Sequence, residues 1–179
     1  MQFLIAAVVV VGVVALLDLV LTVGVVKRLR EHTELLSAGE NPAPALRAGE
    51  EVGAFETFAM DGSPVSRDLV TGETVVAFFS PGCQPCKDKM PEFVRYANTM
   101  PGGRDRVLAV VVGDADAAAE FVSELSPVAR VVVESREGAL SSAFKARAFP
   151  TVLMIGPGDE GLLTVRDDHL ALDRPWASV

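Results

Sequence analysis

The sequence is poor in the residues that bind metals and build disulfide frameworks. Its 179 residues include two cysteines, two histidines, one tryptophan and one tyrosine. Two cysteines cannot form a disulfide framework, and so small a number does not identify the cellular compartment. A four-ligand zinc site would need both cysteines together with His32 and His169, which lie far apart in the sequence. The composition therefore argues against a metal centre.

Positive charge is also scarce. The 16 lysines and arginines stand against 24 aspartates and glutamates, which gives a formal net charge of −8. An acidic chain of this kind argues against a nucleic-acid partner. The hydrophobic fraction is 50% and the mean hydropathy is +0.35, and the apolar excess lies at the N-terminus. The length allows one domain and an appendage.

The N-terminal excess is an almost unbroken apolar run from residue 3 to residue 26. As a helix it would be about 36 Å long at ~1.5 Å per residue, enough to cross a hydrocarbon core of about 30 Å. A cleaved signal peptide fits poorly, because the start has no Lys or Arg and the basic run 27–30 follows the apolar segment. We expect one retained transmembrane helix in contact with the lipid bilayer. Asp18 within it would be protonated or snorkelling, or would contact a membrane partner.

The orientation of this span is ambiguous. Lys27, Arg28 and Arg30 flank its C-terminal end, and the positive-inside rule then places the following domain in the cytoplasm. Large domains can nevertheless translocate despite such flanking charges. The sequence predicts a single-pass membrane protein without fixing the side of its domain.

The chain divides into four predicted segments. Residues 1–28 form the anchor, and 29–49 form a juxtamembrane helix followed by a Pro- and Ala-rich linker. Residues 50–166 form the globular domain, and 167–179 a polar tail. Within the domain, a hairpin over 55–65 turns at Asp61-Gly62. Strands are expected at 74–79, 106–112, 130–133, 152–155 and 162–165, and helices at 87–96, 115–125 (capped by Asp114) and 139–145. This alternation predicts an α/β fold with parallel crossovers and an antiparallel closing edge.

The two cysteines lie together in Cys83-Gln84-Pro85-Cys86, between a buried strand and a helix. Unpaired backbone N–H groups and the macrodipole at a helix N-terminus would stabilise a thiolate at Cys83. Pro85 suits the first helical turn, and one turn brings Cys86 beside Cys83, close enough for a disulfide. This spacing in a strand–helix context indicates a redox pair. A structural disulfide remains an alternative, although so short a loop constrains the unfolded chain little.

A strand, Cys-x-Pro-Cys-Lys at a helix start and a later Phe149-Pro150-Thr151 opening a strand resemble a thioredoxin-like domain. The leading hairpin looks most like the membrane-anchored TlpA/ResA branch. The anchor and the run Ser80-Pro81-Gly82-Cys83 are also similar to MauD, an accessory protein of methylamine utilisation. The resemblance implies a central mixed sheet flanked by helices, with an N-terminal β-hairpin extension.

The resemblance also assigns roles to residues. Cys83 would be the nucleophile and Cys86 the resolving cysteine. Pro150 would be a cis-proline facing the pair, and an extended substrate would pair with the backbone just before it, at Phe149. Pro85 is assigned with Phe149 and Pro150 to the substrate-binding surface.

The chain departs from thioredoxin at three places. Gly82 stands where thioredoxins have a Trp, and Ala77 stands where they bury an acid that helps to accept the proton of the resolving cysteine. The usual final helix is short or missing, which would leave one face of the sheet undercovered. Pro91 matches the helix-kinking proline of the family.

These features predict a membrane-anchored thiol–disulfide oxidoreductase that needs no organic cofactor and no metal. Its partners would be protein thiols and disulfides and a membrane redox protein, and the resemblance favours an extracytoplasmic domain. A peroxiredoxin-like peroxidase is one alternative: Ser80 fits its pattern, but Val76 stands where proline is required. Another is a copper-delivery protein of the Sco type, for which the cysteine spacing is one residue short. A non-catalytic docking module is the last.

Overall fold

The computed structural model describes residues 1, 12, 43–158, 161–174 and 176. The chain divides into two units, Met1–Pro42 and Ala43–Val179. The first contains only two described residues, so the predicted span over 3–26 and the juxtamembrane helix lie outside what the structure describes. Within the described part, no helix combines the length and the apolar character that crossing a membrane requires. The fold that follows is that of the second unit.

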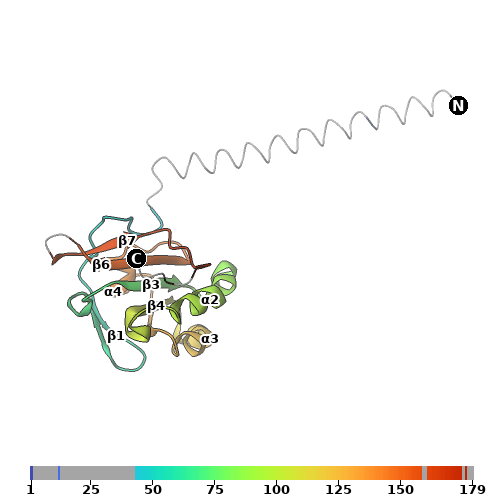
Figure 1. Cartoon of the computed structure of the whole chain (residues 1–179). Helices are drawn as coiled ribbons and strands as arrows, with labels where there is room; N and C mark the ends of the chain where they lie inside the picture. Colours follow the sequence, from blue (N-terminus) through green and yellow to red (C-terminus); the bar gives the residue numbers. More distant parts are fainter. Residues whose placement is uncertain (2–11, 13–42, 159–160, 175, 177–179) are drawn as a thin grey trace. The chain divides into compact units, whose positions relative to one another are not determined.

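A five-stranded mixed sheet forms the centre of this unit, in the order β5-β4-β3-β6-β7 (Figure 1). Parallel pairs join β3 to β4 and β4 to β5, whereas β6 pairs antiparallel with both β3 and β7. The predicted mixed sheet and its antiparallel closing edge are confirmed. The strands are Thr74–Phe79 (β3), Val107–Val112 (β4), Arg130–Glu134 (β5), Thr151–Pro157 (β6) and Leu163–Asp167 (β7).

Three α-helices accompany the sheet, and their positions follow the predicted pattern closely. They are Gln84–Ala97 (α2), Ala115–Leu125 (α3) and Ala139–Ala143 (α4), with short 3-10 turns at Arg67–Leu69 (η1) and Gly103–Arg106 (η2). Helix α2 begins three residues earlier than predicted, so that most of the cysteine motif lies inside it. Asp114 does occupy the N-cap position of α3, but its side chain makes no capping hydrogen bond. The predicted side-chain cap is therefore wrong.

The predicted hairpin is present as a separate two-stranded sheet, Glu56–Phe58 (β1) and Pro64–Ser66 (β2). Its turn is closed by Asp61, whose carboxylate accepts hydrogen bonds from the backbone and hydroxyl of Ser63. Arg104 of η2 forms a salt bridge with the same carboxylate. The Ser63 hydrogen bonds, and then Arg104, hold the pKa of Asp61 well below its usual range. The hairpin tip is thus tied to the main domain.

Side chains of the sheet alternate between two hydrophobic clusters, one on each face. From β3, Val76 and Phe78 enter the cluster shared with α4 and the hairpin. Val75, Ala77 and Phe79 enter the cluster shared with α2 and α3, called the α2-side cluster below. In Figure 1, α2 and α3 accordingly lie next to each other beside the strands. Because both faces are covered, β3 is buried along its whole length, which explains its unbroken apolar sequence.

The ends of the domain also contribute to the core. Ala45 and Leu46, which precede the predicted domain start, are buried in the cluster on the α4 side. At the other end, Leu172 is buried in the α2-side cluster, and Trp176 packs against the same cluster. The backbone N–H of Trp176 donates to the hydroxyl of Thr99. The expectation of an undercovered sheet face is therefore wrong, because apolar side chains of the tail cover part of the face that a final helix would otherwise cover.

Candidate active site

Cys83 lies at the N-cap of α2, at the end of the domain where β3 stops. Its backbone is extended (φ −100°, ψ 110°), and its carbonyl accepts from the N–H groups of Cys86 (3.1 Å) and Lys87 (3.3 Å). The Ser80-to-Cys83 turn connects it to β3. The first turn of α2 holds no acidic residue. The position of Cys83 at a helix N-terminus is as expected from the sequence, and its role as the attacking thiolate stays a prediction.

The ring of Phe79, the last residue of β3, packs against α2 and fixes this helix on the sheet. Phe79 packs edge-to-face on Phe93 of α2 with ring centroids 5.3 Å apart, and it makes a tilted contact with Phe121 of α3 at 6.0 Å. All three side chains are essentially inaccessible to solvent. The cysteine pair is thereby held between the end of a central strand and a helix that packs firmly on the sheet.

Cys86 is fully buried, whereas Cys83 is partly exposed. Both are free thiols in this structure. Burial, followed by the hydrogen bond to Cys83, raises the pKa of Cys86 to about 12, although the backbone N–H of Ser80, 3.5 Å from its sulfur, acts in the opposite direction. The two thiols therefore differ in access to solvent: Cys83 is partly exposed, and Cys86 is buried as a neutral thiol.

Phe149 and Pro150 come from the loop between α4 and β6, and Phe149 contacts Cys83, which precedes it by 66 residues. The thiol of Cys83 donates to the carbonyl oxygen of Phe149 at 3.4 Å. The Phe149–Pro150 peptide bond is cis, as the resemblance implied. The structure thus brings Cys83, Cys86, Phe149 and Pro150 together. Their roles as nucleophile, resolving thiol and substrate-binding residues stay predictions.

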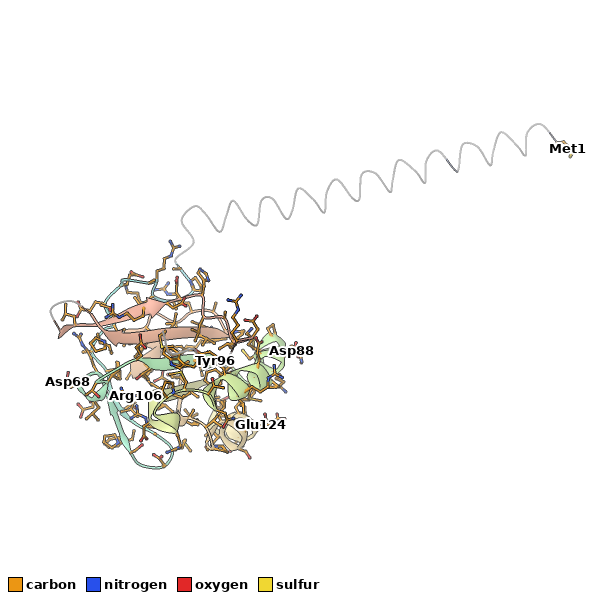
Figure 2. The ribbon with its side chains drawn as sticks, viewed as in Figure 1. Met1, Asp68, Asp88, Tyr96, Arg106 and Glu124 are labelled. Carbon is orange, nitrogen blue, oxygen red and sulfur yellow. The ribbon has the colours of Figure 1, made fainter. Side chains whose placement is uncertain are left out.

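The other residues singled out from the sequence lie nearby. Pro85 is exposed in the first turn of α2, and Pro91 lies inside that helix. Gln84, beside Pro85, donates to Asp88 one turn later, and Figure 2 shows Asp88 at the outer edge of the domain. Binding of substrate at Pro85 stays a prediction.

Ala77 is fully buried in β3 and pairs with Ala109 of β4 and Val152 of β6. The place of the acid found in thioredoxins is thus surrounded by apolar neighbours on both sides. Gly82 is exposed, and a β-carbon added there would meet open space. The surface in front of Cys83 is consequently not covered by a side chain from position 82.

A groove lies beside Pro150, and most of the residues that line it were not predicted from the sequence. One part, of about 640 Å³, is bounded by residues 44–47, by 148 and 150–153, and by 168–169. A second part, of about 270 Å³, shares Pro150 and Val152 and extends to Lys89 of α2 and to Leu170 and Leu172 of the tail. These segments are widely separated in the sequence, so no spacing signal could have joined them. His169, considered earlier only as a metal ligand, lines both parts.

A further residue missed from the sequence is Arg136, in the loop between β5 and α4. Its guanidinium carbon lies 5.5 Å from the centroid of the Phe149 ring, within the range of a cation–π contact. Phe149 therefore faces a cation with its ring and the Cys83 thiol with its carbonyl. A lone arginine among the surface charges carries no sequence signal that would mark it.

Among the described residues, no group of three or more His, Cys, Asp or Glu side chains is arranged to hold a metal ion.

A buried strand ending at a Cys-x-x-Cys helix start, faced by a cis-proline that opens the next antiparallel strand, defines the thioredoxin-like class of redox proteins. The match to a known family agrees: the Redoxin family matches residues 39–159, and the chain belongs to this family. The thioredoxin-like recognition and the prediction of an enzyme of the thiol–disulfide oxidoreductase class are confirmed. No curated protein matches the sequence.

Solved structures of similar fold support the same architecture. A thiol:disulfide interchange protein from Bacteroides sp. superimposes with a TM-score of 0.56 at 18% identity, covering 72% of this chain and 84% of that one. The thioredoxin domain of a thiol-disulfide oxidoreductase from Bacteroides vulgatus gives 0.53 at 17% identity, with 70% and 89% covered. StoA from Bacillus subtilis gives 0.50 at 16% identity, with 68% and 92% covered. At these identities the likeness establishes the fold.

Proposed function

We propose that this protein is a membrane-anchored thiol–disulfide oxidoreductase that exchanges disulfides with protein substrates through Cys83 and Cys86. The observation that supports it most directly is the contact between the Cys83 thiol and the Phe149 carbonyl, 3.4 Å apart, with Cys86 buried behind. A partly exposed thiol next to the backbone of a partly exposed residue suits an extended polypeptide that carries its own sulfur. The similar structures include a thiol:disulfide interchange protein and the thioredoxin domain of a thiol-disulfide oxidoreductase, in agreement with this function.

In the reducing direction the Cys83 thiolate attacks one sulfur of a substrate disulfide. A Cys83–substrate disulfide forms, the substrate S–S bond breaks, and the departing sulfur leaves as a thiolate that takes up a proton. Cys86 then attacks the Cys83 sulfur, which forms the Cys83–Cys86 disulfide and releases the second substrate thiol. Two electrons have passed from the protein dithiol to the substrate, and the same steps run backwards in the oxidising direction.

The second attack needs Cys86 as a thiolate, although its pKa lies near 12 in the reduced protein. Ala77 offers no acid to receive the proton, and its β-sheet neighbours Ala109 and Val152 are apolar. We therefore assign the proton of Cys86 to the departing substrate sulfur or to water that enters beside Gly82. We therefore expect the burial of Cys86 to slow its attack on the Cys83 sulfur.

Replacement of single cysteines tests this assignment. Purified full-length protein should catalyse the reduction of insulin disulfides by dithiothreitol. Cys83→Ser should lose this activity completely, since no other described sulfur of the site is accessible to substrate. Cys86→Ser should keep a single round of attack but no cycle. Equal turnover by the Cys83→Ser variant and the parent protein would refute the role of Cys83.

We propose further that residues 3–26 anchor the protein in a membrane and that its domain lies on the extracytoplasmic side. The length and apolarity of the segment support the anchor. The basic residues 27, 28 and 30 argue for the opposite orientation. Alkaline phosphatase fused after Val179 is active only outside the cytoplasm, whereas green fluorescent protein exported in unfolded form stays dark. An active phosphatase fusion with a dark fluorescent fusion is expected, and the reverse pair would place the domain in the cytoplasm.

A further inference from the structure

We infer that Arg136 selects substrates with an acidic residue next to the reacting disulfide. This inference rests on the proposed function and adds to it a substrate class and a specificity residue. Its basis is the position of a surface guanidinium over Phe149, the same residue whose carbonyl contacts the Cys83 thiol.

The loop between β5 and α4 places Arg136 at the site. Strand β5 ends at Glu134, and α4 begins at Ala139. A turn in which the N–H of Gly138 donates to the Ser135 carbonyl lies between them and projects Arg136 outward. The guanidinium lies over the Phe149 ring and is exposed to solvent, so its charge is presented at the surface where a substrate would lie.

The acid nearest in sequence on the strand side is already engaged elsewhere. The Glu134 carboxylate accepts from the backbone N–H groups of Leu140 (3.1 Å) and Ser141 (2.6 Å), and so caps the start of α4. The described residues form six ion pairs with N–O distances of 4.0 Å or less, and Arg136 takes part in none of them. The guanidinium over Phe149 is thus not held in an ion pair with a described carboxylate, although the exposed Glu137 is its neighbour in sequence.

Two other cations near the site, both on α2, pair with carboxylates. Lys87 pairs with Glu120 at 3.9 Å, and Lys89, at the end of the groove, pairs with Glu92 at 2.8 Å. In the groove itself, His169 lies 4.0 Å from Asp168. Arg136 therefore differs from these two lysines: among the described residues it has no carboxylate within 4.0 Å, and it lies over the residue whose carbonyl contacts the Cys83 thiol.

The net negative charge of the protein makes a local cation important for binding an acidic substrate. A chain with a net charge of −8 repels acidic polypeptides at long range. An acidic substrate therefore needs a cation at the point of contact, and Arg136 can offer a bidentate hydrogen-bonded pair to a carboxylate. For an exposed pair of this kind, a preference of about two- to fivefold per carboxylate is expected.

Three synthetic peptides test the inference. Each carries one intramolecular disulfide, with Asp, Asn or Lys next to its reactive cysteine. The fully reduced full-length protein is mixed with each, and the second-order rate constant of reduction is measured. We expect the Asp peptide to react about threefold faster than the Asn peptide at low salt, and the difference to shrink in about 1 M salt, where the Debye length is about 3 Å.

Variants separate the charge from the structure. Arg136→Met keeps an apolar stem over Phe149 and should abolish the preference for Asp, whereas Arg136→Lys should retain part of it. The matched control is Arg95→Met, which removes an exposed arginine from the far end of α2; it should leave the ratio unchanged. Reduction of a small neutral disulfide, hydroxyethyl disulfide, should be equal in all variants, which shows that the cysteine pair is intact.

The outcomes distinguish the inference from the function on which it rests. Equal rates for the three peptides in the parent protein, or the same loss of preference in Arg95→Met as in Arg136→Met, overturn the role of Arg136 and leave the oxidoreductase in place. Reduction of none of the peptides and no reaction with hydroxyethyl disulfide overturn the oxidoreductase function itself.

Discussion

The burial of Cys86 predicts a large and measurable difference in reactivity. Its pKa is raised to about 12, whereas a cysteine in an unfolded peptide has a pKa of about 8.5. At pH 8 the thiolate fraction of Cys86 is then lower by about 2000-fold than that of a peptide cysteine. A more basic thiolate is intrinsically more nucleophilic. With a Brønsted coefficient of about 0.4–0.5, the rate constant of the Cys86 thiolate is higher by about 40-fold than that of a peptide thiolate, which offsets part of this loss. Protonation alone should therefore slow alkylation of Cys86 about 50-fold, and its complete burial should slow it further.

The assay is site-resolved alkylation of the reduced protein with iodoacetamide, followed by peptide mass spectrometry. Cys86 in the folded protein is compared with Cys86 in the same protein unfolded in urea, and Cys83 serves as the exposed internal reference. Because the pKa is raised, the Cys86 rate should rise about tenfold per pH unit between pH 8 and 11. Native alkylation of Cys86 at the unfolded rate, or a rate independent of pH in this window, would refute the reasoning.

Three further predictions concern the scaffold. Phe93→Ala removes a fully buried ring between α2 and β3 and should lower the free energy of unfolding in urea by about 3–5 kcal/mol, whereas Leu69→Ala, at an exposed position, should change it by less than about 0.5 kcal/mol. Glu134→Gln weakens the charged cap of α4 and should cost about 1 kcal/mol in the same assay, and Glu137→Gln, three residues on and exposed, is its control. The lowered pKa of Asp61 means that its contribution to stability is present above its ordinary value of 3.8 and is lost as the pH falls. Asp61→Asn should accordingly flatten the fall in melting temperature between about pH 5 and pH 2; an unchanged acid profile would contradict the assigned hydrogen bonds.

Much of the fold could be predicted from the sequence because its central strands are buried on both faces. Runs such as those in β3 and β4 are continuous and apolar, which distinguishes them from their surroundings. Local turn chemistry at Asp61 located the hairpin. The site cysteines were equally visible, because two thiols two residues apart at a strand–helix junction carry a specific chemical meaning.

The remainder depends on contacts between distant segments. The packing of Leu172 and Trp176 on the α2-side cluster is a tertiary effect in a segment that looks polar in sequence. The groove beside Pro150 is assembled from three separate segments. Arg136 gains significance only when the turn before α4 brings it over Phe149. Asp114 shows the converse: the residue type and position were right for a cap, and its side chain makes no such bond.

The central claim is that Cys83 attacks substrate and Cys86 resolves the mixed disulfide. The most direct test is to express the Cys86→Ser variant, trap the cells with acid and alkylating agent, and identify by mass spectrometry the cysteine through which partner proteins are bound. The account predicts partners joined through Cys83, released by reductant and absent from the Cys83→Ser, Cys86→Ser double variant. Partners captured equally well by a Cys83→Ser variant through Cys86, or none captured by either single variant, would contradict it.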